Sequence, residues 1–481
     1  MVAPRSLRVK PAPCRPSAAE GCPRPPHHRE CTGAAPGAAG PVKSVRFITF
    51  GCKANQYDTQ VLREALVRRG LAEGDRDADL VVVNTCTVTS EAGRKARQVI
   101  RRIHRETPHA RICVTGCLAE SEPEVLRELP GVEWVLGNGE AKRPASFLKS
   151  LGYEVDPEEL GIPAGITEFA GHTRAFVKIQ DGCDKSCAFC IIPKVRGASR
   201  SRTVADVCTE VAGLVAAGYV EVVLCGIHIG HWGLDLGLQL ADLLGALVRL
   251  APTDPSGTRL PYRLRLSSIE ATEVDERVLA LMVEHPDRIA PHLHMPMQSG
   301  DDAVLARMNR WYTVDEYLAA CARIRAVLDR PAFTADILVG FPGEGEAQFA
   351  NTLATVEAAG FARVHVFPFS ARPGTAAAEM RDVVAPSEVR DRRARLSELA
   401  SELGERYRRS LAGVREMIVL EGFAGLSGRY QRVRLDPEEI DGPPPPSIDV
   451  VLEARAKADG SGTELFGRPV ARAASAGAAS V

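Results

Sequence analysis

The chain carries three closely spaced cysteines in one segment, Cys183-Asp184-Lys185-Ser186-Cys187-Ala188-Phe189-Cys190. The thiols stand at positions i, i+4 and i+7, in a loop that directly follows a predicted strand. A cubane iron–sulfur cluster needs a thiolate or an equivalent ligand on each of its four irons. Three thiols from one loop leave one iron open to a small molecule, as catalytic metal sites keep a vacant position. The spacing therefore predicts a [4Fe–4S] cluster that binds a ligand.

A zinc site is the alternative for this loop. Structural zinc usually takes four ligands, often as two Cys-x-x-Cys-like pairs, and no second pair follows the loop in the sequence. The sequence therefore favours an iron–sulfur cluster over zinc at Cys183, Cys187 and Cys190.

The cysteine loop follows the first of six apolar runs that alternate with helical patterns over residues 170–400. Strands are predicted at 175–180, 220–225, 262–267, 291–297, 333–339 and 363–369. Strand–helix alternation is typical of a parallel sheet covered by helices. Six successive βα units predict an α/β fold built as an open, partial (β/α)6 barrel, in which ligands bind at the carboxyl ends of the strands.

Residues 44–151 show a shorter alternation of the same kind. Strands are predicted at 45–50, 80–84 and 111–115, with helices at 56–69 and 91–105 between them. This pattern predicts a separate, flavodoxin-like domain with a parallel sheet.

A cysteine follows each strand of this first domain: Cys52, Cys86 and Cys117. The carboxyl ends of parallel strands meet at one rim, so the three thiols are expected to converge there on a second iron–sulfur cluster. Taken singly, each would more often be a buried core residue, but the repeated position on successive βα units favours a cluster. Four other cysteines fall inside predicted strands or helices, where packing is the expected role: Cys113, Cys208, Cys225 and Cys321.

The two ends of the chain differ from the rest in composition. Residues 1–43 are rich in proline, alanine and glycine without periodicity, and they are predicted to be a disordered tail, as are residues 471–481. Cys14, Cys22 and Cys31 lie in the first tail and have no expected role. A charged helix at 387–409 leads into a short β-rich region within residues 401–470.

The overall composition limits the partners and the compartment. The 481 residues are 45% hydrophobic and 25% charged, with a formal net charge of −1. No apolar run approaches the ~18–20 residues of a membrane span, and the amino terminus lacks an apolar signal segment, so a soluble, cytoplasmic protein without a membrane partner is expected. With almost no net charge, a nucleic-acid partner would have to bind local basic patches.

Several short motifs give the chain a family resemblance between residues 45 and about 435. They are Thr-Phe-Gly-Cys-Lys-x-Asn-Gln-Tyr at 49–57, Val-Asn-Thr-Cys-Thr-Val-Thr at 83–89, Thr-Gly-Cys at 115–117, Lys-Ile-Gln-Asp-Gly-Cys at 178–183, Arg-Gly-Ala-Ser-Arg-Ser-Arg at 196–202, Gly-Ile-His-Ile-Gly at 226–230, Leu-Ser-Ser-Ile-Glu at 266–270, Met-Gln-Ser-Gly at 297–300 and Val-Gly-Phe-Pro-Gly-Glu at 339–344. With these motifs the chain resembles the radical S-adenosylmethionine methylthiotransferase family.

The first motif decides which branch of the family the chain resembles most. The isopentenyladenosine-modifying branch typically has Gly-Cys-Gln-Met-Asn there, and the ribosomal-protein branch has Gly-Cys-Pro-Lys-Asn. Residues 51–56, Gly-Cys-Lys-Ala-Asn-Gln, fit neither. They resemble the enzymes that convert N6-threonylcarbamoyladenosine at tRNA position 37 to its 2-methylthio form, although Ala54 replaces an expected valine. The alternatives are the other two acceptors, or a non-catalytic iron–sulfur protein that binds RNA.

The resemblance implies a mechanism with two [4Fe–4S] clusters and S-adenosylmethionine. The cluster on Cys183, Cys187 and Cys190 would bind S-adenosylmethionine and split it with one electron, and the resulting 5′-deoxyadenosyl radical would attack the adenine C2–H bond. The cluster on the first-domain cysteines would supply methylated sulfur. The electron would come from a donor such as flavodoxin or ferredoxin.

Four residues at predicted strand ends are candidates for holding S-adenosylmethionine: Gly226, Glu270, Gln298 and Asp336. A carboxylate could bind the ribose or the amino group of the cofactor, and the amide of Gln298 could hydrogen-bond either. The alternative for each is a structural role at the barrel rim.

Two basic segments are candidates for binding the anticodon loop of tRNA. The first follows the cysteine loop and contains Arg196, Arg200 and Arg202. The second contains Arg429, Tyr430 and Arg432, in a terminal segment that resembles a TRAM domain, a small β-barrel that binds RNA. Arginines contact phosphates and an aromatic ring can stack on a base. The alternative is an ordinary solvated charged surface.

Overall fold

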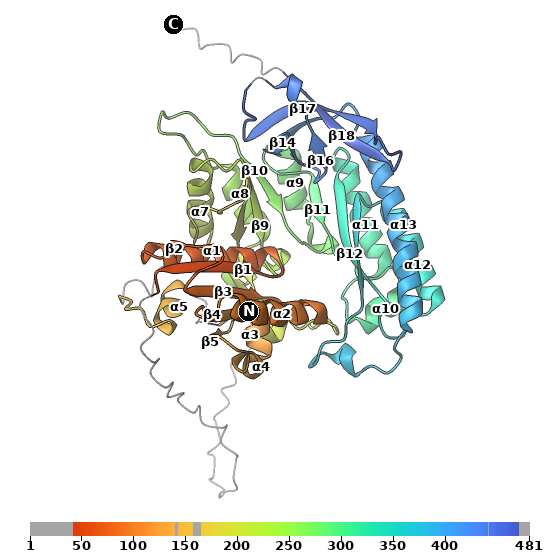
Figure 1. The fold of residues 1–481 in the computed structure, drawn as a ribbon. Helices are drawn as coiled ribbons and strands as arrows, with labels where there is room; N and C mark the ends of the chain where they lie inside the picture. The colour runs from red at the N-terminus through yellow and green to blue at the C-terminus, as the bar shows by residue number, and fades with distance from the viewer. Residues whose placement is uncertain (1–41, 140–142, 157–164, 441, 471–481) are drawn as a thin grey trace, which may run out of the picture. The chain divides into compact units, whose positions relative to one another are not determined.

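The computed structural model describes residues 42–139, 143–156, 165–440 and 442–470 (Figure 1). Both predicted disordered tails therefore lie outside the described residues, except for Val42 and Lys43. Cys14, Cys22 and Cys31 lie outside them as well.

The first domain is a five-stranded parallel sheet in the order β2-β1-β3-β4-β5. This is the strand order of flavodoxin-like folds, so the predicted architecture is confirmed. The strands are β1 (Ser44–Thr49), β2 (Ala72–Glu73), β3 (Leu80–Thr85), β4 (Arg111–Gly116) and β5 (Val132–Leu136), and the helices are α1 (Lys53–Arg68), α2 (Ser90–Glu106), α3 (Cys117–Ser121), α4 (Pro123–Arg127) and α5 (Pro144–Ser150).

The central strand β3 shows why the sheet forms. All six of its residues are buried, and its side chains alternate between two hydrophobic clusters. Val81 and Val83 pack in the cluster that contains Ile100 of α2, whereas Leu80 and Val82 pack in the cluster that contains Leu62 of α1. A strand that is apolar on both faces needs a helix layer on each side.

The second domain contains six parallel strands in chain order, as predicted. They form two three-stranded sheets, β6-β9-β10 and β11-β12-β13, and isolated bridges from Leu264 to Ile289 and from Ser268 to His294 join β10 to the β11 segment. The strands are β6 (Ala175–Lys178), β9 (Glu221–Cys225), β10 (Arg263–Leu266), β11 (His292–His294), β12 (Ala332–Val339) and β13 (Arg363–Pro368). The result is an open, partial barrel.

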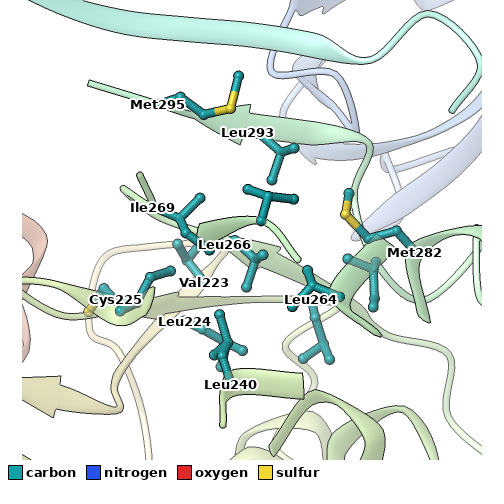
Figure 2. Packing of buried hydrophobic residues seen from close by; sticks show 14 of the residues in the cluster. Val223, Leu224, Cys225, Leu240, Leu264, Leu266, Ile269, Met282, Leu293 and Met295 are labelled. Atoms are coloured by element: carbon teal, nitrogen blue, oxygen red, sulfur yellow. The ribbon is translucent and has the colours of Figure 1, made fainter. Parts of the chain in front are cut away.

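Helices cover the outside of this barrel. They are α7 (Val204–Ala216), α8 (Leu240–Val248), α9 (Glu276–Glu284), α11 (Val314–Val327) and α12 (Glu346–Ala359), with the shorter α6 (Ile192–Arg196) and α10 (Asp302–Arg307) in loops and the two-stranded sheet β7 (Gln180–Asp181) and β8 (Arg200–Ser201) beside the cysteine loop. Figure 2 shows Leu264, Leu266 and Leu293 from neighbouring strands together with Met282 of α9. Cys225 and Cys321 are buried in the same core, as expected for packing cysteines.

The long helix α13 (Pro386–Ser410) leads into a closed, five-stranded barrel. The order is β14-β15-β16-β18-β17, with β14 (Arg415–Glu421), β15 (Ala424–Ser427), β16 (Arg432–Arg434), β17 (Ser447–Ala456) and β18 (Thr463–Pro469). Ile418, Val433 and Leu452 fill its core. The predicted small β-barrel is confirmed, and closure removes the free strand edges. None of the described helices has the length and apolar character needed to span a bilayer.

Candidate active site

The loop of Cys183, Cys187 and Cys190 is held in place by backbone contacts. Gly182 has a φ of +77°, and a Cβ there would collide with the Ala198 carbonyl. The Cys183 amide donates to the Gly197 carbonyl oxygen at 3.0 Å, and the Cys190 amide donates to the Cys187 carbonyl oxygen at 3.0 Å. The glycine thus lets the two ends of the loop approach each other, which curls the three thiols into one group.

The three thiols of this loop lie close together and are half-buried. Burial raises the pKa of Cys190 to about 12, and the neighbouring thiolates of Cys187 and Cys183 add to the rise. Burial likewise raises the pKa of Cys183, with Cys187 contributing. A thiol that is costly to ionise on its own gives up its proton when a metal ion binds its sulfur. This donor set fits a cluster with three protein ligands.

Two polar side chains contact the thiols from the barrel. Arg310 donates from Nη1 to the Sγ of Cys187 at 3.3 Å and from Nη2 to Glu270 Oε2 at 2.6 Å. The Nδ1 of His228 lies 3.6 Å from the Sγ of Cys183. Sequence reasoning missed Arg310, because no spacing in the chain connects Asn309-Arg310-Trp311 to the cysteine loop.

A carboxylate holds His228 in this position. The Nε2 of His228 lies 2.8 Å from Glu273, and the Nε2 of His231 lies 3.3 Å from the same carboxylate. Although burial favours the neutral acid, hydrogen bonds from both histidines lower the pKa of Glu273 to about 2. The two imidazole rings stack nearly parallel, with their centroids 3.9 Å apart. We interpret the group as a support that orients His228 toward the thiols.

Three of the four predicted S-adenosylmethionine residues follow successive strands of the barrel, and the fourth lies within the next strand. Gly226 directly follows β9, and a Cβ there would lie 2.9 Å from the carbonyl oxygen of Gln180. Asp336 lies within β12, and its carboxylate is 3.4 Å from the Nε2 of His294. Glu270 follows β10 and is already engaged by Arg310.

Gln298 provides the test of whether this rim fits a polar ligand. Its backbone is in the left-handed region, with φ at +66°, and its amide donates to the Asp336 carbonyl oxygen at 2.9 Å. Within the described part of the chain, its buried Oε1 has no hydrogen-bond partner. A buried carbonyl oxygen without a donor is costly, so the rim fits a cofactor that brings N–H or O–H groups, as S-adenosylmethionine does.

Cys52, Cys86 and Cys117 follow β1, β3 and β4 and come together at one rim of the first sheet. Burial raises the pKa of Cys86 to about 11, and the nearby Cys117 and Cys52 thiolates contribute to the rise. Gly51 has a φ of +102°, and a Cβ there would lie 2.8 Å from the Cβ of Cys86. The glycine therefore allows the first loop to pack directly against the second cysteine. The donor set again fits a cluster with three protein ligands.

Asn55 and Arg196 connect the two thiol trios. The Nδ2 of Asn55 donates to the carbonyl oxygens of Phe50 at 2.8 Å and Thr85 at 2.9 Å, which precede Cys52 and Cys86 in the chain. Arg196, the last residue of α6, donates to the Oδ1 of Asn55 and pairs with Asp58 and Asp181.

Hydrophobic packing joins the trios at the same place. Cys117 forms a buried cluster with Ile191 and Val195, and Ile191 directly follows Cys190 in the chain. Cys117 therefore lies next to α6, the short helix that directly follows the cysteine loop. From the other side, Arg372 donates to the Thr87 carbonyl oxygen beside Cys86.

The six predicted RNA-binding residues divide into two groups. Arg200 and Arg432 are exposed. The other four make contacts within the protein. In the first segment, Arg196 is 4% exposed and ion-paired, and Arg202 pairs with Glu210. In the second, Arg429 is buried and donates to Glu416 and to the Asp329 carbonyl oxygen, and Tyr430 stacks on His292 with ring centroids 4.7 Å apart. Their role in RNA contact stays a prediction, and in this structure these groups already have protein partners.

Comparisons with known proteins show the family of the chain. Residues 177–356 match the model of the radical SAM superfamily, and residues 44–137 match a family described as uncharacterized protein family UPF0004. The chain is 39% identical, over 76% of its length and 82% of the relative, to a threonylcarbamoyladenosine tRNA methylthiotransferase (MtaB) of Bacillus subtilis. It is 36% identical, over 83% of its length and 84% of the relative, to a tRNA-2-methylthio-N(6)-dimethylallyladenosine synthase of Parafrankia.

A solved structure supports the fold. The radical S-adenosylmethionine methyltransferase TsrM from Kitasatospora setae, with tryptophan substrate and a SAM analogue bound, matches with a TM-score of 0.51 and 17% identity, over 83% of this chain and 79% of that one. Fold and site thus define a radical S-adenosylmethionine enzyme. More narrowly, the chain belongs to the radical S-adenosylmethionine methylthiotransferase family. Its cofactors are S-adenosylmethionine and [4Fe–4S] clusters, which the two thiol trios and the barrel rim fit.

Proposed function

We propose that this enzyme transfers a methylthio group to C2 of N6-threonylcarbamoyladenosine at position 37 of tRNA. The observation that supports the transfer is the contact of Cys117 with Ile191 and Val195, which brings the second cysteine trio next to the helix that directly follows the cysteine loop. A radical enzyme that only cleaves S-adenosylmethionine needs the first trio alone. The second trio fits a sulfur source held next to the radical site.

The residues of the chain have distinct tasks in this proposal. Cys183, Cys187 and Cys190 hold the cluster that, with S-adenosylmethionine, supplies the radical chemistry when bound. Gln298 and Gly226 hold the cofactor, the first through its unpartnered Oε1 and the second by leaving room for close approach. Asp336 is placed to bind its ribose or amino group.

Apolar side chains cover the back of the cysteine loop. Ala188 lies in a buried cluster with Met308 and Phe341, and Phe189 packs against this cluster. The Ala188 amide also donates to the Met308 carbonyl oxygen at 2.8 Å. These contacts keep water from one side of the reacting centre, where it would favour side reactions.

The proposed RNA partner is the anticodon loop of tRNA, and the proposed source of electrons is flavodoxin or ferredoxin. Four MtaB relatives, 33–39% identical to the chain, are named for tRNA. Arg200 and Arg432 are the exposed members of the predicted basic segments, so we assign the phosphate contacts to them.

A second acceptor, isopentenyladenosine in tRNA, is supported by a specific finding. Relatives named tRNA-2-methylthio-N(6)-dimethylallyladenosine synthase are 35–36% identical over 78–83% of the chain. Their identity overlaps that of the MtaB relatives. What favours threonylcarbamoyladenosine is Lys53, at the position where the isopentenyl branch typically has glutamine.

The test uses full-length protein reconstituted anaerobically with iron and sulfide. It is incubated with S-adenosylmethionine, a reductant and anticodon stem-loops bearing threonylcarbamoyladenosine or isopentenyladenosine, and the nucleosides are analysed by mass spectrometry. We expect the 2-methylthio product from the threonylcarbamoyl stem-loop. A product from the isopentenyl stem-loop alone would assign the enzyme to the second acceptor.

A further inference from the structure

The segment at 369–377, which follows the last barrel strand and is called the connecting segment below, packs against the cysteine loop. The amide of Ala377 donates to the carbonyl oxygen of Ala188, within that loop, at 2.8 Å. Both residues belong to one buried hydrophobic cluster. Nearby, the Nζ of Lys194 in α6 donates to the carbonyl oxygen of Gly374. One end of the connecting segment is thus fixed to the radical site.

Arg372, in the middle of the connecting segment, contacts the first domain. Its Nη2 donates to the carbonyl oxygen of Thr87, the residue after Cys86, and lies 3.3 Å from the Oγ1 of Thr87. Its Nη1 donates to the Oγ of Ser90 at 3.3 Å. The Oγ of Ser370 lies 3.0 Å from the same hydroxyl. The connecting segment therefore also holds the loop between Cys86 and α2.

Thr87 links this loop to another cysteine of the first domain. Its Oγ1 accepts a hydrogen bond from the Oγ of Ser121 at 3.4 Å. Ser121 is the last residue of α3, and Cys117 is the first. The residue that Arg372 contacts is therefore connected to Cys86 by the chain and to the helix of Cys117 by a hydrogen bond.

The side chain of Arg372 is buried between the two domains, because only 7% of the residue is exposed. A turn fixes its backbone: the carbonyl oxygen of Arg372 accepts from the amide of Thr375 at 3.1 Å and from its Oγ1 at 2.8 Å. Within the described residues, the guanidinium gives all its hydrogen bonds to Thr87 and Ser90. It therefore joins the barrel to the first domain and stabilises neither domain on its own.

Arg372 and Arg196 hold the first domain at two different places. Arg196 contacts Asn55 and Asp58 of α1, whereas Arg372 contacts the loop after Cys86. Two separate contacts resist rotation of one domain against the other, which a single contact does not.

We propose that Arg372 is a positioning residue that holds the auxiliary trio in register with the radical trio during methylthio transfer. The inference rests on the proposed function, in which one substrate must reach both sites. A displacement of about 1 Å can slow a reaction about a hundredfold. If the Cys86 loop shifts, S-adenosylmethionine is still cleaved, but the methylthio group is out of reach of the substrate.

The first test is hydrogen–deuterium exchange of the full-length, reconstituted enzyme. Arg372→Met removes the guanidinium and keeps a long side chain. Amides at 86–93 should exchange about ten- to a hundredfold faster, which is the range for losing a hydrogen bond from a charged group. Exchange in the barrel should stay as in wild type. Arg381→Met, which removes an exposed arginine shortly after the connecting segment, should change neither region. Wild-type exchange at 86–93 in Arg372→Met overturns the proposal.

The second test measures the 5′-deoxyadenosine formed per methylthiolated nucleoside. Arg372→Met should retain both clusters by iron analysis and raise this ratio about tenfold or more, and the magnetic interaction between the reduced clusters should change in electron paramagnetic resonance spectra. Arg372→Lys keeps the charge but lacks the planar fork that reaches Thr87 and Ser90 together, so its ratio should lie between those of Arg372→Met and wild type. A wild-type ratio in Arg372→Lys would show that charge alone matters, which overturns the positioning role.

Two other roles of Arg372 give different results. If the side chain only stabilises the fold, Arg372→Met lowers the unfolding temperature and raises exchange throughout the chain, while the product ratio is unchanged. If it contacts an RNA phosphate, stem-loop binding weakens and exchange at 86–93 in the free enzyme is that of wild type. Either result overturns the proposal.

Ser90→Ala covers the case in which Arg372→Met does not retain its clusters. It removes one acceptor of the guanidinium and leaves Arg372 in place, so exchange at 86–93 and the product ratio should each rise several-fold. Wild-type values of both overturn the proposal.

The fate of the proposed function is read separately, from the wild-type product. If wild type methylthiolates no stem-loop, the proposed function fails, and exchange and the magnetic interaction still test Arg372. If wild type forms the product but Arg372→Met keeps the wild-type exchange and ratio, the positioning role is wrong and the proposed function stands.

Discussion

The two cysteine trios show two ways of building the same kind of ligand set. Cys183, Cys187 and Cys190 come from one loop, closed by backbone hydrogen bonds within residues 182–198. Cys52, Cys86 and Cys117 come from the ends of three strands, so their convergence requires a complete parallel sheet. The first trio depends on local geometry and the second on the fold of a domain. Substitutions should therefore separate them.

The largest effect is expected from removing one thiol of the loop. Cys187→Ala leaves the radical cluster with two protein ligands, so cleavage of S-adenosylmethionine should fall to background. The first-domain trio does not share this loop, and about half of the bound iron should remain. Iron analysis and quantification of 5′-deoxyadenosine under reducing conditions test this. Continued production of 5′-deoxyadenosine would falsify the assignment of the radical site.

The converse substitution is Cys86→Ala. Cys86 is buried between the loops of Cys52 and Cys117, so the auxiliary cluster should be lost while the radical loop keeps its three thiols. The variant should still cleave S-adenosylmethionine but form no methylthiolated nucleoside. The same two assays, run with the stem-loop substrate, measure both outcomes. Wild-type amounts of product would show that the second trio is not the sulfur site.

The first-domain trio of Cys52, Cys86 and Cys117 should also depend on one glycine contact. Gly51→Ala forces a side chain into the left-handed region, at about 1–2 kcal/mol, and places its Cβ 2.8 Å from the Cβ of Cys86. Gly70→Ala is the matched control, with a φ of +86° and open space around the added Cβ. Both variants should lose stability in thermal unfolding of the apoprotein. Gly51→Ala alone should also lose auxiliary iron, and equal iron contents would contradict the role of the contact.

Sequence patterns predicted the strands well, because an apolar run is a local signal. The strand predicted at 80–84, which begins with the apolar run Leu80–Val83, and the six apolar runs of the barrel are found where expected. The two-residue, exposed strand β2 carried no such pattern. Neither did β5, which packs at the edge of the sheet and is mostly half-buried.

The chemistry around the thiols could be predicted less well, because it depends on residues far apart in the chain. Arg196 is in a basic segment and was expected to contact RNA. Its partner Asp58 lies 138 residues away, so no pattern along the chain indicated that the charge is neutralised. Arg310 is likewise 123 residues from Cys187. Charge runs reveal where cations are, but only tertiary structure reveals which of them have partners.

Arg196 forms a junction between the two trios through its contacts with Asn55 and Asp58 of the first domain. The substitution Arg196→Lys tests this junction. Lysine keeps the charge but cannot hold Asn55, Asp58 and Asp181 at once, because it lacks the planar fork of guanidinium. We expect both clusters to assemble while coupling between them weakens. The variant should form several-fold more 5′-deoxyadenosine per methylthiolated product, and the magnetic interaction between the two reduced clusters should change in electron paramagnetic resonance spectra. Unchanged values of both would show that the junction only stabilises the fold.

The smallest effect is expected from Arg200, four residues further along the same segment. Its side chain is exposed, whereas that of Arg196 is buried in the junction. Arg200→Ala should leave both clusters and the unfolding temperature unchanged and should weaken stem-loop binding about two- to fivefold, while lowering the salt dependence of binding by about one unit of slope. A binding titration over a range of salt concentrations measures both. If the affinity and the salt dependence of binding were those of wild type, Arg200 would be an ordinary solvated cation. Arg200 and Arg196 would then differ only in burial.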